Sequence, residues 1–171
     1  MPSAIVVTIG SASANSYATL EEAATYFGDR LNASAWDAAS GGDDQTKALL
    51  MACKRLEREN WLGSRVDSTQ YLSWPRYGVE KVDSVGGTAD FYGYVATYTS
   101  TEIPQQVKDA QCELALAYLA GYGQSGGNTV KSFTADGFSV SFSETRSETA
   151  LPESVSRLLA PLIRGPQLVR A

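Results

Sequence analysis

The sequence contains no histidine and only two cysteines. Without histidine the chain lacks the most common general base near neutral pH and the most common ligand of transition metals. It also shows no constellation of carboxylates, lysine or tyrosine that would replace them. Cys53 and Cys112 stand alone in helical segments without CxxC spacing, which favours two buried thiols over a disulfide or a zinc site. We therefore expect no enzyme, no metal and no cofactor.

Other features are also missing from the chain. It has no apolar run long enough for a membrane span, and no basic region precedes the apolar residues 4–9, so we expect no membrane association and synthesis in the cytoplasm. The net charge of -5 argues against a protein that wraps nucleic acid by neutralising its phosphates. A length of 171 residues with 43% hydrophobic residues indicates one globular domain.

The apolar residues follow a helical period in several segments. Thr19 and Glu22 form a capping-box pattern at the start of the first, and Ile103-Pro104 opens the longest, which is rich in alanine. We predict a mainly α fold, a small helical bundle around this central Ala-rich helix, with a β-hairpin and extended N- and C-terminal arms. The predicted helices cover residues 19–31, 32–40, 43–60, 103–121 and 152–163.

A β-hairpin is predicted over residues 130–143, where apolar and polar residues alternate on both sides of Asp136-Gly137. Residues 80–102 are rich in Gly, Ser, Thr and Tyr and fit either a surface hairpin or a flexible loop. The predicted organisation is a single domain, 1–171. It comprises an N-terminal arm (1–16), a helical core (17–127) with an insertion at about 80–102, the β-hairpin (128–145), and a C-terminal helix and tail (151–171).

The stretch from Trp61 to Val79 follows neither a helical nor a strict strand period. We interpret it as a rigid structural joint made by Trp61, Trp74, Pro75 and Arg76, in which the tryptophans are buried anchors. Its arginines, Arg65 and Arg76, have two readings, contact with a surface outside the protomer or hydrogen bonds to carbonyls of the same chain. The helix before it carries a basic side with Lys47, Lys54, Arg55 and Arg58. This side fits either contact with DNA or an acidic partner or a solvated face balanced by Glu57 and Glu59, and we favour the solvated face.

The order of these motifs resembles the head-tail connector adaptors of tailed bacteriophages, also called head-completion proteins. Some of these carry the label DnaT-like single-stranded-DNA-binding protein. This sequence departs from the pattern in the longer Tyr/Gly-rich insertion before Ile103. The matching residues are Asn15-Ser16-Tyr17, Leu20-Glu21-Glu22-Ala23, Tyr26-Phe27, Trp36, Lys47-Ala48-Leu49 through Leu56, Trp61, Gly63, Arg65, Gln70, Trp74-Pro75-Arg76, Val79, Ile103-Pro104, Val107, Ala110, Glu113 and Leu159-Ala160-Pro161-Leu162.

The resemblance implies a structural virion protein at the head-tail interface. Such a protomer assembles as a ring, commonly a dodecamer, under the portal, where it extends the DNA channel and joins the capsid to the tail. Its implied partners are the portal protein, neighbouring adaptor subunits, a tail or second connector protein, and DNA that passes through without sequence-specific binding.

Two sets of residues are candidates for these contacts, because a head-to-tail ring needs two different surface patches. For docking on the portal we predict the C-terminal residues Leu158, Leu159, Leu162, Ile163, Arg164, Leu168, Val169 and Arg170. For contacts between subunits we predict Ile5, Val6, Val7, Phe138, Val140 and Phe142.

The alternative function is that of a single-stranded-DNA-binding replication accessory protein. This function needs aromatic platforms in a basic groove. Tyr71, Trp74 and Arg76 would supply part of one, although the net acidity weighs against it.

Overall fold

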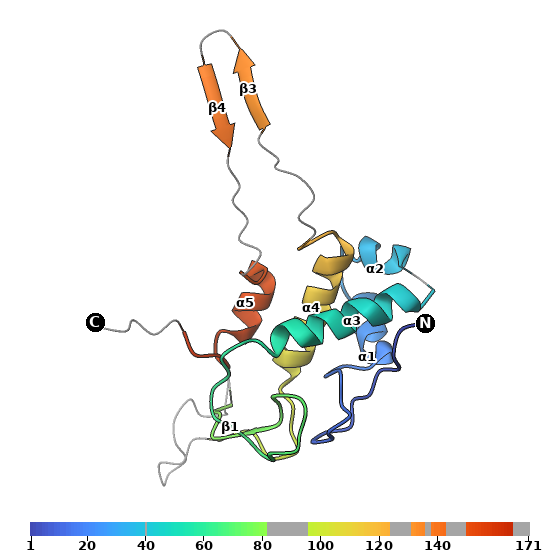
Figure 1. Cartoon of the computed structure of the whole chain (residues 1–171), viewed down its shortest axis with the longest axis vertical. Helices are drawn as coiled ribbons and strands as arrows, with labels where there is room; N and C mark the ends of the chain where they lie inside the picture. Colours follow the sequence, from blue (N-terminus) through green and yellow to red (C-terminus); the bar gives the residue numbers. More distant parts are fainter. Residues whose placement is uncertain (40, 82–95, 124–130, 136–137, 143–149, 166–171) are drawn as a thin grey trace, which may run out of the picture.

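The computed structural model describes residues 1–39, 41–81, 96–123, 131–135, 138–142 and 150–165. The fold is mainly helical with a short antiparallel hairpin, as predicted (Figure 1). Across the described residues, no helix combines the length and apolarity that crossing a bilayer requires. In chain order the elements are α1 (Leu20–Gly28), α2 (Ser34–Ala38), α3 (Asp43–Leu56), β1 (Ser64–Arg65), β2 (Arg76–Tyr77), α4 (Gln105–Leu119), β3 (Lys131–Ala135), β4 (Phe138–Phe142) and α5 (Glu153–Leu159).

Helix α1 begins with the predicted capping box. The Glu22 amide donates to the Thr19 hydroxyl over 3.0 Å, and the Thr19 amide donates to the Glu22 carboxylate over 2.8 Å. The helix ends at Gly28 and not at Leu31, because Asp29 leaves the helical geometry and the Arg30 amide bonds to the Phe27 carbonyl in a tighter turn. Leu31, predicted on the apolar face, is therefore 85% exposed.

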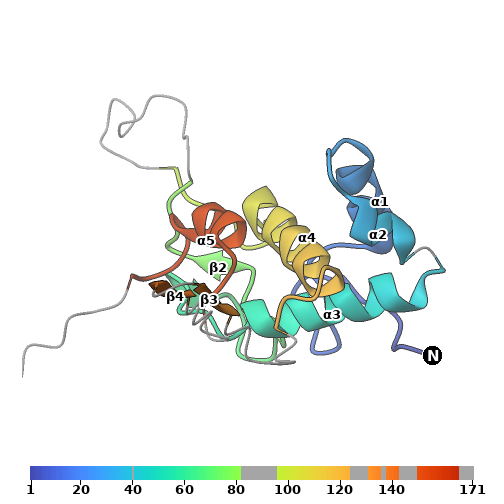
Figure 2. The same cartoon turned by 90° about the horizontal axis from the view of Figure 1, so that it is seen from above.

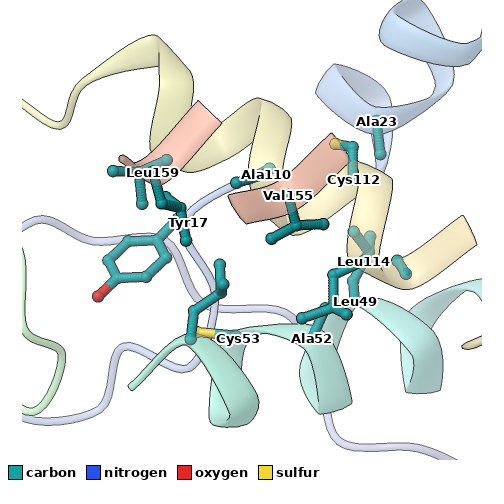
Figure 3. Close-up of a cluster of buried hydrophobic side chains, with 14 of the residues drawn as sticks. Tyr17, Ala23, Leu49, Ala52, Cys53, Ala110, Cys112, Leu114, Val155 and Leu159 are labelled. Carbon is teal, nitrogen blue, oxygen red and sulfur yellow. The ribbon is translucent and has the colours of Figure 1, made fainter. Parts of the chain in front are cut away.

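Helix α4 is the centre of the bundle and packs against the other four described helices (Figures 1 and 2). Its residues 111–116 are all buried, and its small side chains let the neighbouring helices approach closely. Figure 3 shows Ala110 and Leu114 of α4 in one cluster with Leu49 of α3 and Val155 of α5. Helix α5 is only seven residues long, so its packing on α4 and not its own propensity keeps it helical.

Two buried polar residues of α4 fix the elements that surround it. The Gln111 side chain is completely buried, accepts from the amides of Tyr17 and Ala18, and donates to the Leu49 carbonyl over 2.9 Å. Glu113 accepts two hydrogen bonds from the Arg30 guanidinium, at 2.6 and 2.9 Å. These contacts bind the segment before α1, the residues after α1, and α3 to the central helix.

The predicted insertion begins as an antiparallel pair. The Lys81 amide donates to the Ala96 carbonyl over 2.8 Å, and the Tyr98 amide donates to the Val79 carbonyl over 3.0 Å. This pairing favours the hairpin reading at the base of the insertion; residues 82–95 lie outside the described part of the chain.

Strands β3 and β4 form the hairpin predicted around Asp136-Gly137. Their register runs from Ala135 opposite Phe138 to Lys131 opposite Phe142. In Figure 1 the two strands stand apart from the helices.

Candidate functional site

The joint between α3 and β2 is built around buried aromatic rings. Trp74 is 1% exposed, and its ring makes edge contacts with Trp61 at 5.9 Å and Tyr98 at 5.6 Å between centroids. Because its ring is buried, Trp74 cannot serve as a stacking platform for a ligand in this fold. The peptide bond between Trp74 and Pro75 is cis.

Arg76 is held inside the same joint. Its guanidinium donates to the carbonyls of Leu62 and Gly63, at 2.5 and 2.8 Å, and to that of Ser73 at 3.2 Å. Burial, and then the nearby charge of Arg65, lower the pKa of Arg76. Of the two readings of the arginines, Arg76 fits the intramolecular one.

A carboxylate at the end of α3 attaches the joint to the core. Glu57 accepts from the Tyr17 hydroxyl with one oxygen, and from the amide and hydroxyl of Ser73, both at 2.9 Å, with the other. Burial, and then Glu57, raise the pKa of Tyr17 well above its ordinary value. Tyr17 therefore stays protonated as a donor, and the position of the Glu57 carboxylate is fixed by three hydrogen bonds.

An open groove lies beside this carboxylate, and we call it the Tyr71 groove. Its volume is about 460 Å³, within the range of about 300 to 1,000 Å³ that is usual for small-ligand sites. The N-terminal segment supplies one side and α3 and the joint supply the others. Its lining residues are Ala12, Ser13, Ala14, Asn15, Cys53, Lys54, Glu57, Arg65, Tyr71 and Leu72.

The Tyr71 groove combines an exposed ring with cations. Tyr71 is 61% exposed, although its backbone amide is fixed by a bond to the Ser11 carbonyl. The Arg65 side chain is 46% exposed, and its guanidinium lies 4.0 Å from Glu57. With Lys54, the groove has two cations and one carboxylate, a surplus of one positive charge. An aromatic face beside cations is the arrangement by which proteins hold unpaired nucleotides.

The polar amides near the groove are already in use. The Asn15 side chain accepts from the Val6 amide over 2.7 Å and donates to the Ala4 carbonyl over 2.8 Å. The Gln70 side chain donates to two carbonyls of the joint and accepts from the Asp67 amide. Asn15 lines the groove with its oxygen and one N–H committed to the backbone, whereas Gln70 lies outside the lining and holds the joint.

The residues predicted to dock on a portal are placed differently from one another. Leu159 and Leu162 are completely buried in the core, so neither side chain can contact a partner in this fold. Ile163 is half-buried and forms an antiparallel bridge with Trp61, whereas Arg164 is exposed. Leu158 is half-buried, and Leu168, Val169 and Arg170 lie outside the described residues. The C-terminal segment thus seals the joint, which the helical period alone did not indicate.

The residues predicted to contact other subunits are spread over two places. Ile5, Val6 and Val7 are half-buried in the N-terminal arm, where Asn15 pairs with the backbone of Val6. Phe138, Val140 and Phe142 belong to β4, and their side chains lie outside the description. The structure does not bring the two sets together.

From the sequence, the basic side with Lys54 is interpreted as a solvated face, and the role of Arg65 stays open. In the structure both residues line the groove. The sequence alone does not show how the joint folds. In the structure this fold places Tyr71 beside α3.

The comparisons with known proteins gave one result. No curated protein and no solved structure matched the chain. A family model matched residues 3–171. The match bears on the single-stranded-DNA label within the resemblance and not on its connector part. Because it covers almost the whole sequence, the chain belongs to the family described as "Putative DnaT-like ssDNA binding protein".

Proposed function

We propose that this protein binds single-stranded DNA, with modest affinity and without sequence preference. The observation that carries the proposal is the exposed ring of Tyr71 beside Lys54 and Arg65 in an open groove. The printed description of the family favours the same function.

The composition of the surface sets the expected strength of this binding. Trp61 and Trp74 are buried, which leaves few rings for stacking, and the net charge of -5 makes long-range attraction to DNA weak. The groove's surplus of one positive charge neutralises one phosphate, which gives a slope of log K against log salt of about -0.7. Non-specific binding usually has dissociation constants of about 10⁻⁶ to 10⁻⁴ M. We therefore expect a dissociation constant within this range or a weaker one.

Fluorescence anisotropy with a labelled thymidine oligonucleotide tests the proposal. The oligonucleotide is longer than the roughly 4 to 16 nucleotides that one single-strand-binding fold covers. The titration starts at about 10 mM salt, where the Debye length is about 30 Å. We expect saturable binding that weakens with added salt and that an excess of unlabelled duplex displaces poorly. Absence of binding at this low salt overturns the proposal.

A second candidate is the ring-forming head-tail connector adaptor, and a different observation favours it. Strands β3 and β4 stand apart from the helices (Figure 1), and a two-stranded hairpin is only marginally stable alone in water. Its open edges are suited to pairing with another chain. In this reading the hairpin and the N-terminal arm contact neighbouring subunits, and the exposed part of the C-terminal segment faces the portal.

The two candidates are separated by deleting residues 128–145. For a connector, electron microscopy of the intact chain mixed with its portal shows rings or bound particles, and the deletion abolishes them while helical circular dichroism is retained. If the intact chain neither forms rings nor associates with the portal, the connector candidate fails. The deletion leaves the Tyr71 groove in place, so single-stranded DNA binding should survive it. Neither candidate requires catalysis, a cofactor or a membrane.

A further inference from the structure

We infer that the Tyr71 groove holds one unpaired nucleotide, with its base stacked on Tyr71 and its phosphate between Lys54 and Arg65. This inference rests on the proposed function and specifies where and how the strand is held.

The size and shape of the groove favour a single nucleotide. Its volume of about 460 Å³ suits one small ligand, and among the described residues that line it Tyr71 is the only aromatic one. A base inside a duplex is stacked on its neighbours, so only an unpaired base offers its face to the ring. The groove therefore distinguishes single strands from duplex by the availability of a base face.

The charges of the groove also match one phosphate. Lys54 on α3 and Arg65 on β1 line it together, and a phosphodiester carries one negative charge. Glu57 lies on the same wall and is held by Tyr17 and Ser73, so it cannot swing away from a bound strand. Its repulsion restricts the phosphate to the side of the two cations and lowers the affinity for additional phosphates.

The bonds of Asn15 limit base reading in the groove. Its oxygen and one N–H are occupied by backbone groups, so one amide hydrogen is left for a base edge, and Gln70 does not line the groove. Stacking acts on every base, since each has a π face. Homopolymers of the four bases should then bind with affinities that mainly follow stacking strength.

A pair of tyrosine variants provides the first test. Tyr71→Ala removes the platform, whereas Tyr77→Ala removes a ring that is 50% exposed but does not line the groove. Anisotropy with the thymidine oligonucleotide should show a loss of about 5-fold to about 150-fold for Tyr71→Ala. Tyr77→Ala and Tyr71→Phe, which keeps the stacking face, should remain within about 2-fold of the wild type.

A pair of lysine variants tests the phosphate contact. Lys54→Met removes a groove cation, and Lys47→Met removes an exposed cation of the same helix that is paired with Asp44. Losing one phosphate contact should reduce the salt slope by about 0.7 for Lys54→Met only. Equal effects of both variants would mean that only the overall charge matters, and would overturn the inference.

Photocrosslinking locates the base directly. An oligonucleotide that carries 5-iodouracil is irradiated with the wild-type chain, and the modified peptide is identified by mass spectrometry. We expect the crosslink on Tyr71. If the wild type binds the oligonucleotide but crosslinks elsewhere, or if Tyr71→Ala binds like the wild type, the inference fails while single-stranded DNA binding stands. If the wild type does not bind at all, the proposed function fails with it.

Discussion

Replacing Gln111 with leucine should lower the free energy of unfolding by more than replacing an exposed glutamine, because its side chain bonds to Tyr17, Ala18, Ser16 and Leu49. The side chain is completely buried on α4, where it accepts from the Tyr17 amide at 2.9 Å and from the Ala18 amide at 3.1 Å. It also donates to the Ser16 hydroxyl at 2.7 Å and to the Leu49 carbonyl at 2.9 Å. A leucine of similar size can make none of these bonds.

The groups left behind determine the magnitude. The two amides would have no acceptor, at a cost of about 2 kcal/mol each. The Leu49 carbonyl lies within helix α3 and keeps its intrahelical bond. Losing only the additional bond from Gln111 should therefore cost about 1 kcal/mol. Leucine returns about 2 kcal/mol through its apolar surface. The net cost is about 3 kcal/mol, a large part of a typical stability of about 5 to 15 kcal/mol.

Urea denaturation monitored by tryptophan fluorescence measures this cost as a change in the free energy of unfolding. Gln105→Leu is the matched control, because Gln105 lies on the same helix but is exposed and bonds only to Asp109, at 2.8 Å. We expect less than about 0.5 kcal/mol for the control. A cost below about 1 kcal/mol for Gln111→Leu, or equal costs for the two variants, would refute the reasoning that Gln111 holds the N-terminal segment on the core.

Three further predictions concern the buried thiols and the joint. Burial raises the pKa of Cys53 and of Cys112 from 9.0 to about 12, so both thiols should resist a thiol reagent at pH 8 and react once urea unfolds the chain; fast reaction of the native protein would contradict their burial. Because the thiol pKa values are higher in the folded than in the unfolded chain, the stability linked to the protonated thiols is complete below pH 9 and is lost as the pH rises towards about 12. Urea midpoints measured across this range should fall, and a constant midpoint would refute this prediction. Gly63→Ala should lower the melting temperature more than Gly78→Ala, although both glycines have positive φ, because only at Gly63 would the new Cβ lie 2.1 Å from a backbone carbonyl oxygen; equal shifts would show that this close approach does not matter.

The helices and the hairpin were predictable from the sequence because their signals are local. The capping box at Thr19, the proline before α4 and the turn at Asp136-Gly137 each act within a few residues of chain. The helix ends were predicted less well. Helix α3 stops at Leu56 rather than near Asn60, since tighter turns follow in which the Glu59 amide bonds to the Leu56 carbonyl at 3.0 Å.

The candidate site was only partly predictable, because it depends on contacts between distant residues. Lys54 lies on α3 and Tyr71 within the joint, and only the folding of the joint brings them to one groove. The burial of Leu162 was missed for a related reason. A helical period identifies an apolar face but does not say whether the chain's own core or a partner covers it, and here the core does.

The residues of the joint and those of the groove depend on each other through Glu57. The Tyr17 and Ser73 bonds hold the carboxylate in place, and the same bonds keep the segment with Tyr71 and Leu72 against α3. The shape of the groove is thus a consequence of the packing that anchors Trp74. The hairpin stands apart from this unit (Figure 1), so a change in β3 or β4 should leave the groove intact. If both proposals hold, nucleotide binding and assembly through the hairpin are separable properties, and a variant of one part should leave the other function unchanged.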